Sequence, residues 1–370
     1  MQVNSPEERL AILHVPFMEF NPRHHLRDQG GTAKGFVDNG ISTKLLIGKM
    51  RENTGAVEFD IVETGNTEIN SISNHFSETV AFVRELIRDR PNVILVWNVG
   101  FIPSIEGVLL KLLSPILGLK TKSILRLDWD GEVRTQGRIR KLLFFANLKI
   151  ASAMFDWITV ETSCAIEKVS KMICKPNRLK LVPVGIYPSY SNKTINKEVR
   201  EKIVLCVARI AEYKNIMGSL KVFNEVNREF PSWKFIQIGM VQDKDYFQKL
   251  VDYTTTAGLA SKVKFEGELE YEAIEDWMAR ASVFITLSDA ESFNLARYEA
   301  MSAGLKVISS PAGCAKDFPG IEVVHDISDA ADALRRSLAE FERNHMKLSF
   351  EYSKVNTWDD IAVMFLSLNR

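Results

Sequence analysis

Short apolar runs rich in β-branched and aromatic residues alternate with longer segments of helical spacing along most of the chain. In the first half, the runs that we predict to be strands are 10–15, 42–47, 93–97, 123–127, 157–160 and 179–182. In the second half they are 203–208, 233–238, 263–265, 283–286, 306–309 and 322–324. The spacing of apolar residues predicts helices over 217–229, 245–257, 270–281, 294–303 and 328–340. This alternation is typical of βαβ units and parallel sheets.

The alternation lapses over 186–202, where Ser, Asn, Lys and Tyr replace periodic apolar positions. A chain of 370 residues also exceeds the size at which one hydrophobic core usually stops growing. We therefore place a linker here and predict two doubly wound α/β domains. Their bounds are 1–188 and 200–345, followed by a C-terminal segment, 346–370.

Charge and cysteine content exclude several classes of protein. Lys and Arg together number 47, as do Asp and Glu, so no net field attracts the chain to nucleic acid or to an anionic membrane, and any such attraction must be local. The four cysteines lack CxxC or zinc-ligand spacing. We expect no signal peptide in residues 1–9, because charged residues precede the first apolar run, and prolines and charges interrupt the apolar stretch 93–119. We expect a cytoplasmic protein, with a peripheral position on the cytoplasmic face of a membrane as an alternative.

A polar loop between the predicted strand 283–286 and the predicted helix 294–303 carries two glutamates. A helix that begins at the carboxyl end of a parallel strand presents free N–H groups and a positive dipole end, which suit a diphosphate. Glu291 lies in the turn, and Glu299 lies about two helical turns further on. The two acids can therefore reach one ligand from different depths, although such pairs also occur on many surface helices.

The glutamate pair, followed by Ala-Met-Ser-Ala-Gly and by Lys-Val-Ile-Ser-Ser from Lys306, resembles the donor-site signature of GT-B glycosyltransferases of the retaining family 4, or group 1, type. The resemblance implies that Glu299 binds the ribose hydroxyls. It implies that Glu291 and the backbone of the next residues hold the sugar and the diphosphate. These next residues are Ser292, Phe293, Asn294 and Leu295. Asn294 stands where the family usually has glycine.

Two further segments carry the same resemblance. Arg209 and Lys214 follow a predicted strand with the spacing of the family's basic pair, and Ala208 replaces the glycine before that arginine. Two cations near a leaving diphosphate would neutralise the charge that grows as the glycosidic bond breaks. The strand and turn over 263–269 resemble the segment whose backbone binds the nucleotide base. The base-contacting residues implied are Gly267, Glu268 and Leu269.

The first half would supply the acceptor site and one catalytic polar group. Gly30 and Gly31 resemble the glycine loop that lets backbone amides approach the donor phosphate, with a plain turn as the alternative. The family often has a histidine at a strand end near the cleft, and Asp128 is our candidate for that position. Asp128 and Asp130 also suit a metal site of the GT-A type or the capping of a helix. The GT-A interpretation leaves 291–304 unexplained, so we predict no metal.

Three histidines are further candidates for a function. His24 and His25 precede the glycine pair and could meet an acceptor hydroxyl, although an exposed histidine pair is more often without function. His14 lies on the first predicted strand, where we expect a satisfied core residue.

Residues 134–149 place Arg138, Arg140, Lys141 and Lys149 among leucines and phenylalanines. Such a basic amphipathic helix could lie on an anionic membrane, with about 1 kcal/mol from each cation near the surface. A helix packed on the sheet with a solvated basic face is the alternative. In the membrane interpretation, the acceptor is lipid-linked.

These features together predict a GT-B enzyme, an α/β protein with two Rossmann-like domains facing a cleft. It would transfer a sugar from a nucleoside-diphosphate sugar to a hydroxyl of a glycan or lipid-linked acceptor, and the resemblance implies retention of configuration. Trp358 and the helix after it resemble the segment that crosses back to the first domain. No cofactor or metal is expected. The alternatives are an epimerase or phosphorylase of the same fold and a non-catalytic sugar-nucleotide-binding scaffold.

Overall fold

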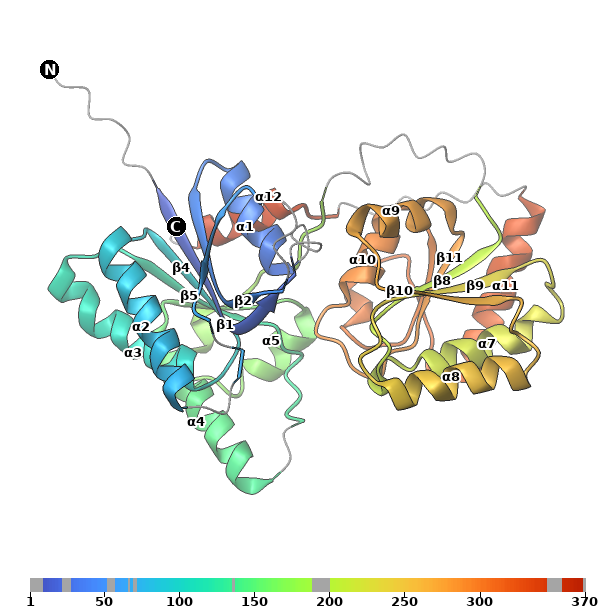
Figure 1. Ribbon diagram of the computed structural model, residues 1–370, viewed down its shortest axis with the longest axis horizontal. Helices are drawn as coiled ribbons and strands as arrows, with labels where there is room; N and C mark the ends of the chain where they lie inside the picture. Colours follow the sequence, from blue (N-terminus) through green and yellow to red (C-terminus); the bar gives the residue numbers. More distant parts are fainter. Residues whose placement is uncertain are drawn as a thin grey trace, which may run out of the picture. The chain divides into compact units, whose positions relative to one another are not determined.

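The computed structural model describes residues 9–21, 28–51, 57–65, 67–68, 72–134, 137–187, 200–344 and 355–368. The chain divides into two compact units (Figure 1). Unit 1 consists of Met1–Tyr187 and Asn356–Arg370, and unit 2 of Pro188–Val355. Each unit is built on its own parallel sheet, as the alternation of strands and helices predicts.

Unit 1 contains a seven-stranded parallel sheet in the order β3-β2-β1-β4-β5-β6-β7. Its strands are β1 (Leu10–Phe20), β2 (Ser42–Met50), β3 (Asp60–Glu63), β4 (Val93–Trp97), β5 (Lys122–Leu127), β6 (Trp157–Val160) and β7 (Leu179–Leu181). Every residue of β4 and β5 is buried. Helices on both faces shield such strands, so their apolar runs are continuous rather than alternating.

The helices of unit 1 form two layers. They are α1 (Asp28–Asp38), α2 (Ile72–Asp89), α3 (Phe101–Leu117), α4 (Arg138–Met154), α5 (Ser163–Val169) and α12 (Trp358–Ser367). On one face of the sheet α1 packs against α12, and on the other α2, α3 and α4 lie side by side (Figure 1). Right-handed crossovers dictate this arrangement, because the chain first moves from β1 toward β3 and then returns through β4 to β7.

The C-terminal helix α12 is an integral part of unit 1. A Cβ atom on Gly31 would lie 2.2 Å from the Trp358 ring, and one on Gly35 would lie 2.3 Å from the Trp358 carbonyl oxygen. Lys122 on β5 donates from Nζ to the carbonyl oxygen of Phe365 at 3.2 Å, near the end of α12. The two glycines of α1 therefore permit a close helix contact that larger residues would prevent.

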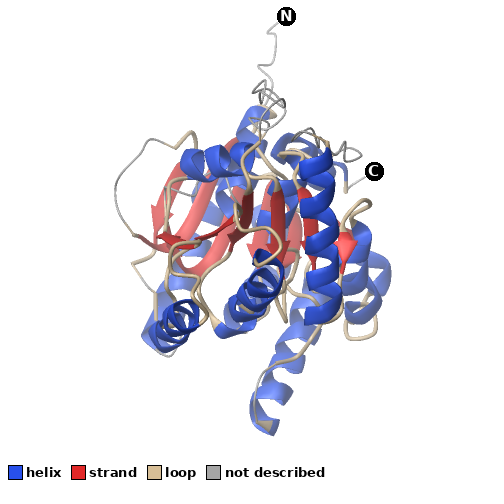
Figure 2. Cartoon of the chain, turned by 90° about the vertical axis from the view of Figure 1, so that its right-hand side faces the viewer, coloured by secondary structure: helices blue, strands red, loops and turns tan. Residues whose placement is uncertain are grey.

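Unit 2 contains a six-stranded parallel sheet in the order β10-β9-β8-β11-β12-β13. Its strands are β8 (Ile203–Val207), β9 (Lys234–Ile238), β10 (Val263–Gly267), β11 (Val283–Thr286), β12 (Lys306–Ser309) and β13 (Glu322–Val323). Its helices are α7 (Ile216–Asn227), α8 (Lys244–Thr256), α9 (Tyr271–Arg280), α10 (Leu295–Ser302) and α11 (Ile327–Arg343). Helices flank this sheet on both sides (Figure 2).

The strand order of unit 2 reverses direction at β8. From β8 the chain moves outward through β9 to β10, and then crosses to β11 on the other side of β8. Ligands of doubly wound folds bind beyond the carboxyl ends of the strands at such a reversal point. We therefore expect a ligand-binding site at the loops that follow β8 and β11.

The predicted fold class is confirmed, with local differences. β3 was not predicted, because its sequence Asp-Ile-Val-Glu has only two apolar residues and is partly exposed. β1 continues to Phe20 across an irregularity near Phe17, whose φ is 59°. Most of the predicted linker, 186–202, lies outside the described residues. Among the helices that the structure describes, none is long and apolar enough to cross a membrane.

Candidate functional site

An ion pair joins the loops that follow β8 and β11. Lys214 lies in a 3₁₀ turn, Glu212–Lys214, after β8, and its Nζ is 2.7 Å from each carboxylate oxygen of Glu291. The two side chains are only 13% and 11% exposed. This partial burial strengthens the attraction relative to a surface pair while leaving an approach from solvent. The structure thus brings together two predicted site residues that are 77 positions apart in the sequence.

Further donors hold the Glu291 carboxylate in place. Ser288 donates from its hydroxyl to Oε1 at 2.8 Å, and Asn294 donates from Nδ2 to the same oxygen at 3.3 Å. Asn294 also donates to the hydroxyl of Thr286, the last residue of β11, at 3.1 Å. Together with Lys214, these contacts fix the carboxylate at the strand end before any ligand binds.

Asn294 is the N-cap of α10 and has a left-handed backbone. Its φ is 73°, and its side-chain oxygen accepts the N–H of Arg297 at 3.1 Å. Asn tolerates this conformation better than most residues because its short polar side chain bonds locally. The residue that replaces the family's glycine therefore adopts a backbone conformation that glycine would also favour, and it adds a helix cap.

Arg297 is a component of this site that the sequence analysis missed. Its fully buried guanidinium donates to the carbonyl oxygens of Phe293, Ala312 and Gly313 at 2.6–2.7 Å. It also lies 4.5 Å above the Phe318 ring, and burial lowers its pKa to about 10. Arg297 thus ties the loop after β12 to the start of α10. The sequence signal that could have identified Arg297 is a basic residue on the inner side of a short helix.

Tyr213 is a second residue that the sequence analysis missed. Its hydroxyl accepts a hydrogen bond from the exposed Arg209 guanidinium at 2.8 Å, and Lys214 Nζ lies 5.1 Å from the centre of its ring. Its carbonyl oxygen accepts the N–H of Asp289 at 2.9 Å, which links the loop after β8 to the loop after β11. The two predicted cations therefore both contact one aromatic residue.

The other predicted donor residues lie in the same unit. Glu299 is buried in the second turn of α10. Gly267 ends β10 with φ 73°, and its carbonyl oxygen accepts the N–H of Gly239 at 2.7 Å. Phe293 is buried and its ring packs edge-on against Phe318, so only its backbone can face a ligand. The half-buried remainder of the predicted set comprises Glu268, Leu269, Ser292 and Leu295.

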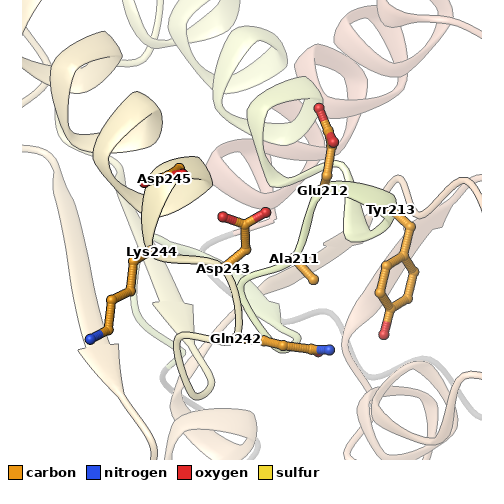
Figure 3. Close-up of a pocket in the computed structure, with 7 residues that line it drawn as sticks. All are labelled: Ala211, Glu212, Tyr213, Gln242, Asp243, Lys244 and Asp245. Atoms are coloured by element: carbon orange, nitrogen blue, oxygen red, sulfur yellow. The ribbon is translucent and has the colours of Figure 1, made fainter.

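A cavity of about 480 Å³ opens beside Tyr213 (Figure 3). The loop after β8 contributes Ala211, Glu212 and Tyr213 to its wall. The loop after β9 contributes Gln242 and Asp243, and the first turn of α8 contributes Lys244 and Asp245. This volume suits a metabolite-sized ligand. Three carboxylates in the wall disfavour a diphosphate here and favour hydroxyl or amide groups.

In unit 1, Asp128 follows β5 in a cluster of charged residues. Gln29 donates from Nε2 to Oδ2 of Asp128 at 3.3 Å, and Arg126 Nε lies 3.6 Å from its Oδ1. Arg126 also pairs with Glu161 at 3.1 Å. Burial raises the pKa of Asp128 well above its ordinary value, and the negative charges of Asp28 and Glu161 add to the increase. Such a carboxyl retains its proton more readily than an exposed aspartate and can donate a hydrogen bond.

The same cluster could in principle hold a cation. Asp28, Asp128 and Glu161 each offer an oxygen within 4.8 Å of the others. Arg126, however, already places a positive charge beside two of these carboxylates. Asp130 does not belong to the cluster, because it accepts from the Glu132 N–H and pairs with Arg134. The suggestion that Asp130 caps a helix is also wrong, since α4 begins after Gly137.

The glycine loop is wrong as a local structure, because Gly30 and Gly31 lie in the first turn of α1, where Gly31 faces Trp358. Whether they contribute to donor binding stays a prediction. His24 and His25 lie outside the described residues. His14 is a buried core residue, with Glu78 at 3.0 Å and Glu106 at 2.6 Å.

The sequence and the fold both resemble known glycosyltransferases. Residues 191–349 match the family of glycosyl transferases group 1. An alpha-monoglucosyldiacylglycerol synthase from Acholeplasma laidlawii is 28% identical over 43% of this chain and 44% of its own. A GDP-mannose:cellobiosyl-diphosphopolyprenol alpha-mannosyltransferase from Xanthomonas oryzae is 27% identical over 46% and 44%. The matches thus span less than half the length of these curated relatives.

Two solved structures agree with the fold along almost the whole chain. HepE of Anabaena, solved with UDP and glucose, has a TM-score of 0.66 at 13% identity and covers 97% of both chains. Sucrose-phosphate synthase from Thermosynechococcus elongatus has a TM-score of 0.69 at 15% identity and covers 98% of both. At this identity, the likeness establishes the fold alone. Residues 191–349 of the chain thus match the family of glycosyl transferases group 1, and the two parallel α/β units have the GT-B fold.

Proposed function

We propose that the protein transfers a sugar from a nucleoside-diphosphate sugar to a hydroxyl group of an acceptor. The observation that carries this proposal is the Lys214–Glu291 pair, at the point where the strand order of unit 2 reverses. Relatives named as a mannosyltransferase and an N-acetylglucosaminyltransferase, and structures solved with UDP or UDP-glucose, support it.

Each group of predicted residues in unit 2 would bind a different part of the donor. The leaving diphosphate would lie at the N-terminus of α10, where backbone N–H groups and the helix dipole favour negative charge. Lys214 and Arg209 would stabilise the charge that develops on it. Glu291 would hold the sugar, Glu299 the ribose hydroxyls, and the backbone of 267–269 the base. These cations do the work that a metal would otherwise do, so we propose a metal-independent reaction that requires no cofactor.

Unit 1 would bind the acceptor, a glycan or a lipid-linked hydroxyl compound. Asp128 is our candidate for the polar group that meets the donor sugar from this unit, because its raised pKa suits a carboxyl that donates a hydrogen bond. We further propose that the reaction retains the anomeric configuration of the sugar. We also propose a cytoplasmic location, with peripheral contact to the membrane through 134–149.

Substitution of Glu291 tests the site directly. Glu291→Gln keeps the size of the side chain and removes the charge that pairs with Lys214. We expect transfer to fall about a hundredfold or more, measured with UDP- and GDP-sugars, while the unfolding transition is kept. Glu272→Gln, an exposed acid on α9, is the matched control. Undiminished transfer by Glu291→Gln would remove Glu291 from the mechanism.

Two observations separate the alternatives. A sugar-nucleotide-binding scaffold would show a ligand-induced increase in Tm without turnover, because binding to the folded state alone raises its stability. An epimerase would convert the sugar nucleotide without consuming an acceptor.

We expect sugar transfer to continue at full rate in the presence of a metal chelator. A loss of activity that a divalent ion restores would instead assign the Asp28–Asp128–Glu161 cluster to a metal.

A further inference from the structure

Exposed apolar side chains of the described residues gather on one layer of unit 1. Fourteen large apolar residues are exposed, and eleven of them lie on α2, α3 and α4. They are Ile72, Phe76, Val80, Ile87, Phe101, Leu112, Ile116, Ile139, Leu142, Leu143 and Ile150. Single exposed apolar residues are ordinary on a soluble protein, whereas such a concentration indicates an interaction surface. We call the outer surface of these three helices the α2–α4 face.

Each helix carries two apolar stripes. On α2 the exposed stripe contains Ile72, which is 90% exposed, and Phe76 and Val80 follow at intervals of four residues. A different side of the same helix buries Phe82 and Leu86 in the core. A helix that only covered a sheet would have one such stripe. The second stripe is therefore not needed by the fold.

The other two helices repeat this pattern. Leu112 and Ile116 lie one turn apart on α3, and Ile116 is 76% exposed, while Leu110 is buried. On α4, Ile139 is 75% exposed and Leu143 lies one turn further on, while other α4 residues pack in the core. The three helices lie side by side on one face of the sheet with their buried sides toward it (Figure 1). Their exposed stripes therefore point outward together.

The acidic residues of these helices are withdrawn from the α2–α4 face. Glu78, Glu85 and Glu106 are buried. The remaining acid, Asp89, is 14% exposed and pairs with Lys44 at 2.6 Å. No acid occurs in α4.

The basic residues of the same helices remain at the surface. On α4 these are Arg138, Arg140, Lys141 and Lys149. The α2–α4 face thus combines apolar side chains with cations, and its anions point inward or are paired.

We infer that the α2–α4 face binds the surface of a bilayer that contains anionic lipid. Apolar side chains would enter the boundary between headgroups and acyl chains, and the cations would meet the lipid phosphates. This inference deepens the lipid-linked acceptor of the proposed function, but binding to lipid does not require the transfer reaction. A second copy of the chain fits less well, because a two-fold contact brings the same patch together from both sides and so places cations opposite cations.

Vesicle binding by the full chain tests the inference. The protein is sedimented with vesicles of phosphatidylcholine alone and of an equal mixture of phosphatidylcholine and phosphatidylglycerol. We expect binding to the mixed vesicles only, and weaker binding as salt is added. The double variant Arg140→Gln, Lys141→Gln should lower the partition coefficient about thirtyfold, since each cation contributes about 1 kcal/mol and 1.4 kcal/mol is a factor of ten.

Two further variants make the test specific. Ile139→Ser with Leu143→Ser removes two exposed apolar side chains and should weaken binding at every salt concentration. Lys221→Gln with Lys249→Gln removes two exposed lysines of unit 2 and should leave vesicle binding unchanged. Three results would each overturn the inference. They are equal vesicle binding by all variants, equal binding to vesicles with and without anionic lipid, and a concentration-dependent dimer without vesicle binding. The Tm increase produced by UDP-sugars, measured on the same proteins, reports separately on the proposed function.

Discussion

At the scale of single residues, the Glu291 carboxylate keeps its orientation when one of its donors is lost. Ser288 and Asn294 would still hold it without Lys214. We therefore expect Lys214→Met to reduce kcat of sugar transfer by about a hundredfold to a thousandfold, because a preorganised charge beside the leaving group is lost. Lys214→Arg should restore part of the rate. An equal loss with both substitutions would indicate a structural role for Lys214 and contradict the prediction.

His14 makes the stability of unit 1 depend on pH. Burial lowers its pKa, but Glu106 and Glu78 outweigh this effect and raise it from 6.5 to about 9. The folded state therefore binds the proton more tightly than the unfolded chain. The resulting stabilisation is complete below pH 6.5 and is lost as the pH rises through about 9. Urea unfolding followed from pH 6 to pH 10 should show a decline that the variant His14→Gln lacks.

The same variant also leaves two buried glutamates without their cation. Removing one member of a buried ion pair costs about 3–5 kcal/mol, so His14→Gln should lower the free energy of unfolding by this amount at pH 7. The sequence predicted only a satisfied core histidine at this position. Its two partners are 64 and 92 positions away, so no local pattern could have identified them.

Other residues of the candidate site show the same limit. Glu291, Glu299 and Lys214 could be predicted because they belong to motifs that resemble those of a known family and that follow a recognisable order of strand, loop and helix. Arg297 and Tyr213 were missed because their importance depends on carbonyl groups and loops that only the folded chain brings near them.

At the scale of elements, the packing of α1 on α12 depends on glycine. In Gly31→Ala, the new methyl group would start 2.2 Å from the Trp358 ring, so one helix must shift. We expect a loss of about 1–3 kcal/mol in the unfolding of unit 1. Gly100→Ala is a suitable control, since its backbone is extended and the added atom would lie 3.8 Å from Pro103. Equal stability of the two variants would contradict this packing role.

The strands show which elements a sequence can predict. Buried central strands such as β4 and β11 appear as continuous apolar runs, and their predicted bounds agree with the structure. The edge strand β3 is short and half-exposed, so its composition does not distinguish it from a loop. The family resemblance predicts a glycine loop at Gly30 and Gly31, whereas both lie in a helix, where the contact of Gly31 with α12 requires a small residue.

At the scale of the whole molecule, the chain enters unit 2 and returns to unit 1. Ile186 donates its N–H to the carbonyl oxygen of Asn356 at 3.0 Å, and Trp358 donates to Ile186 at 3.2 Å. The outgoing and returning segments are therefore neighbours within unit 1. This return could be anticipated from the resemblance at Trp358, but the paired backbones could not, because residues separated by 170 positions form them.

Because its two connecting segments are neighbours, unit 2 is a domain inserted into unit 1. A short linker of glycine and serine in place of 188–355 should let unit 1 fold alone, because the two chain segments that it would join already lie beside each other. We expect this shortened protein to unfold cooperatively in urea, and the fragment 1–187 alone to lose that cooperativity. Because α12 follows unit 2 in the sequence, unit 2 is synthesised before the helix that completes unit 1.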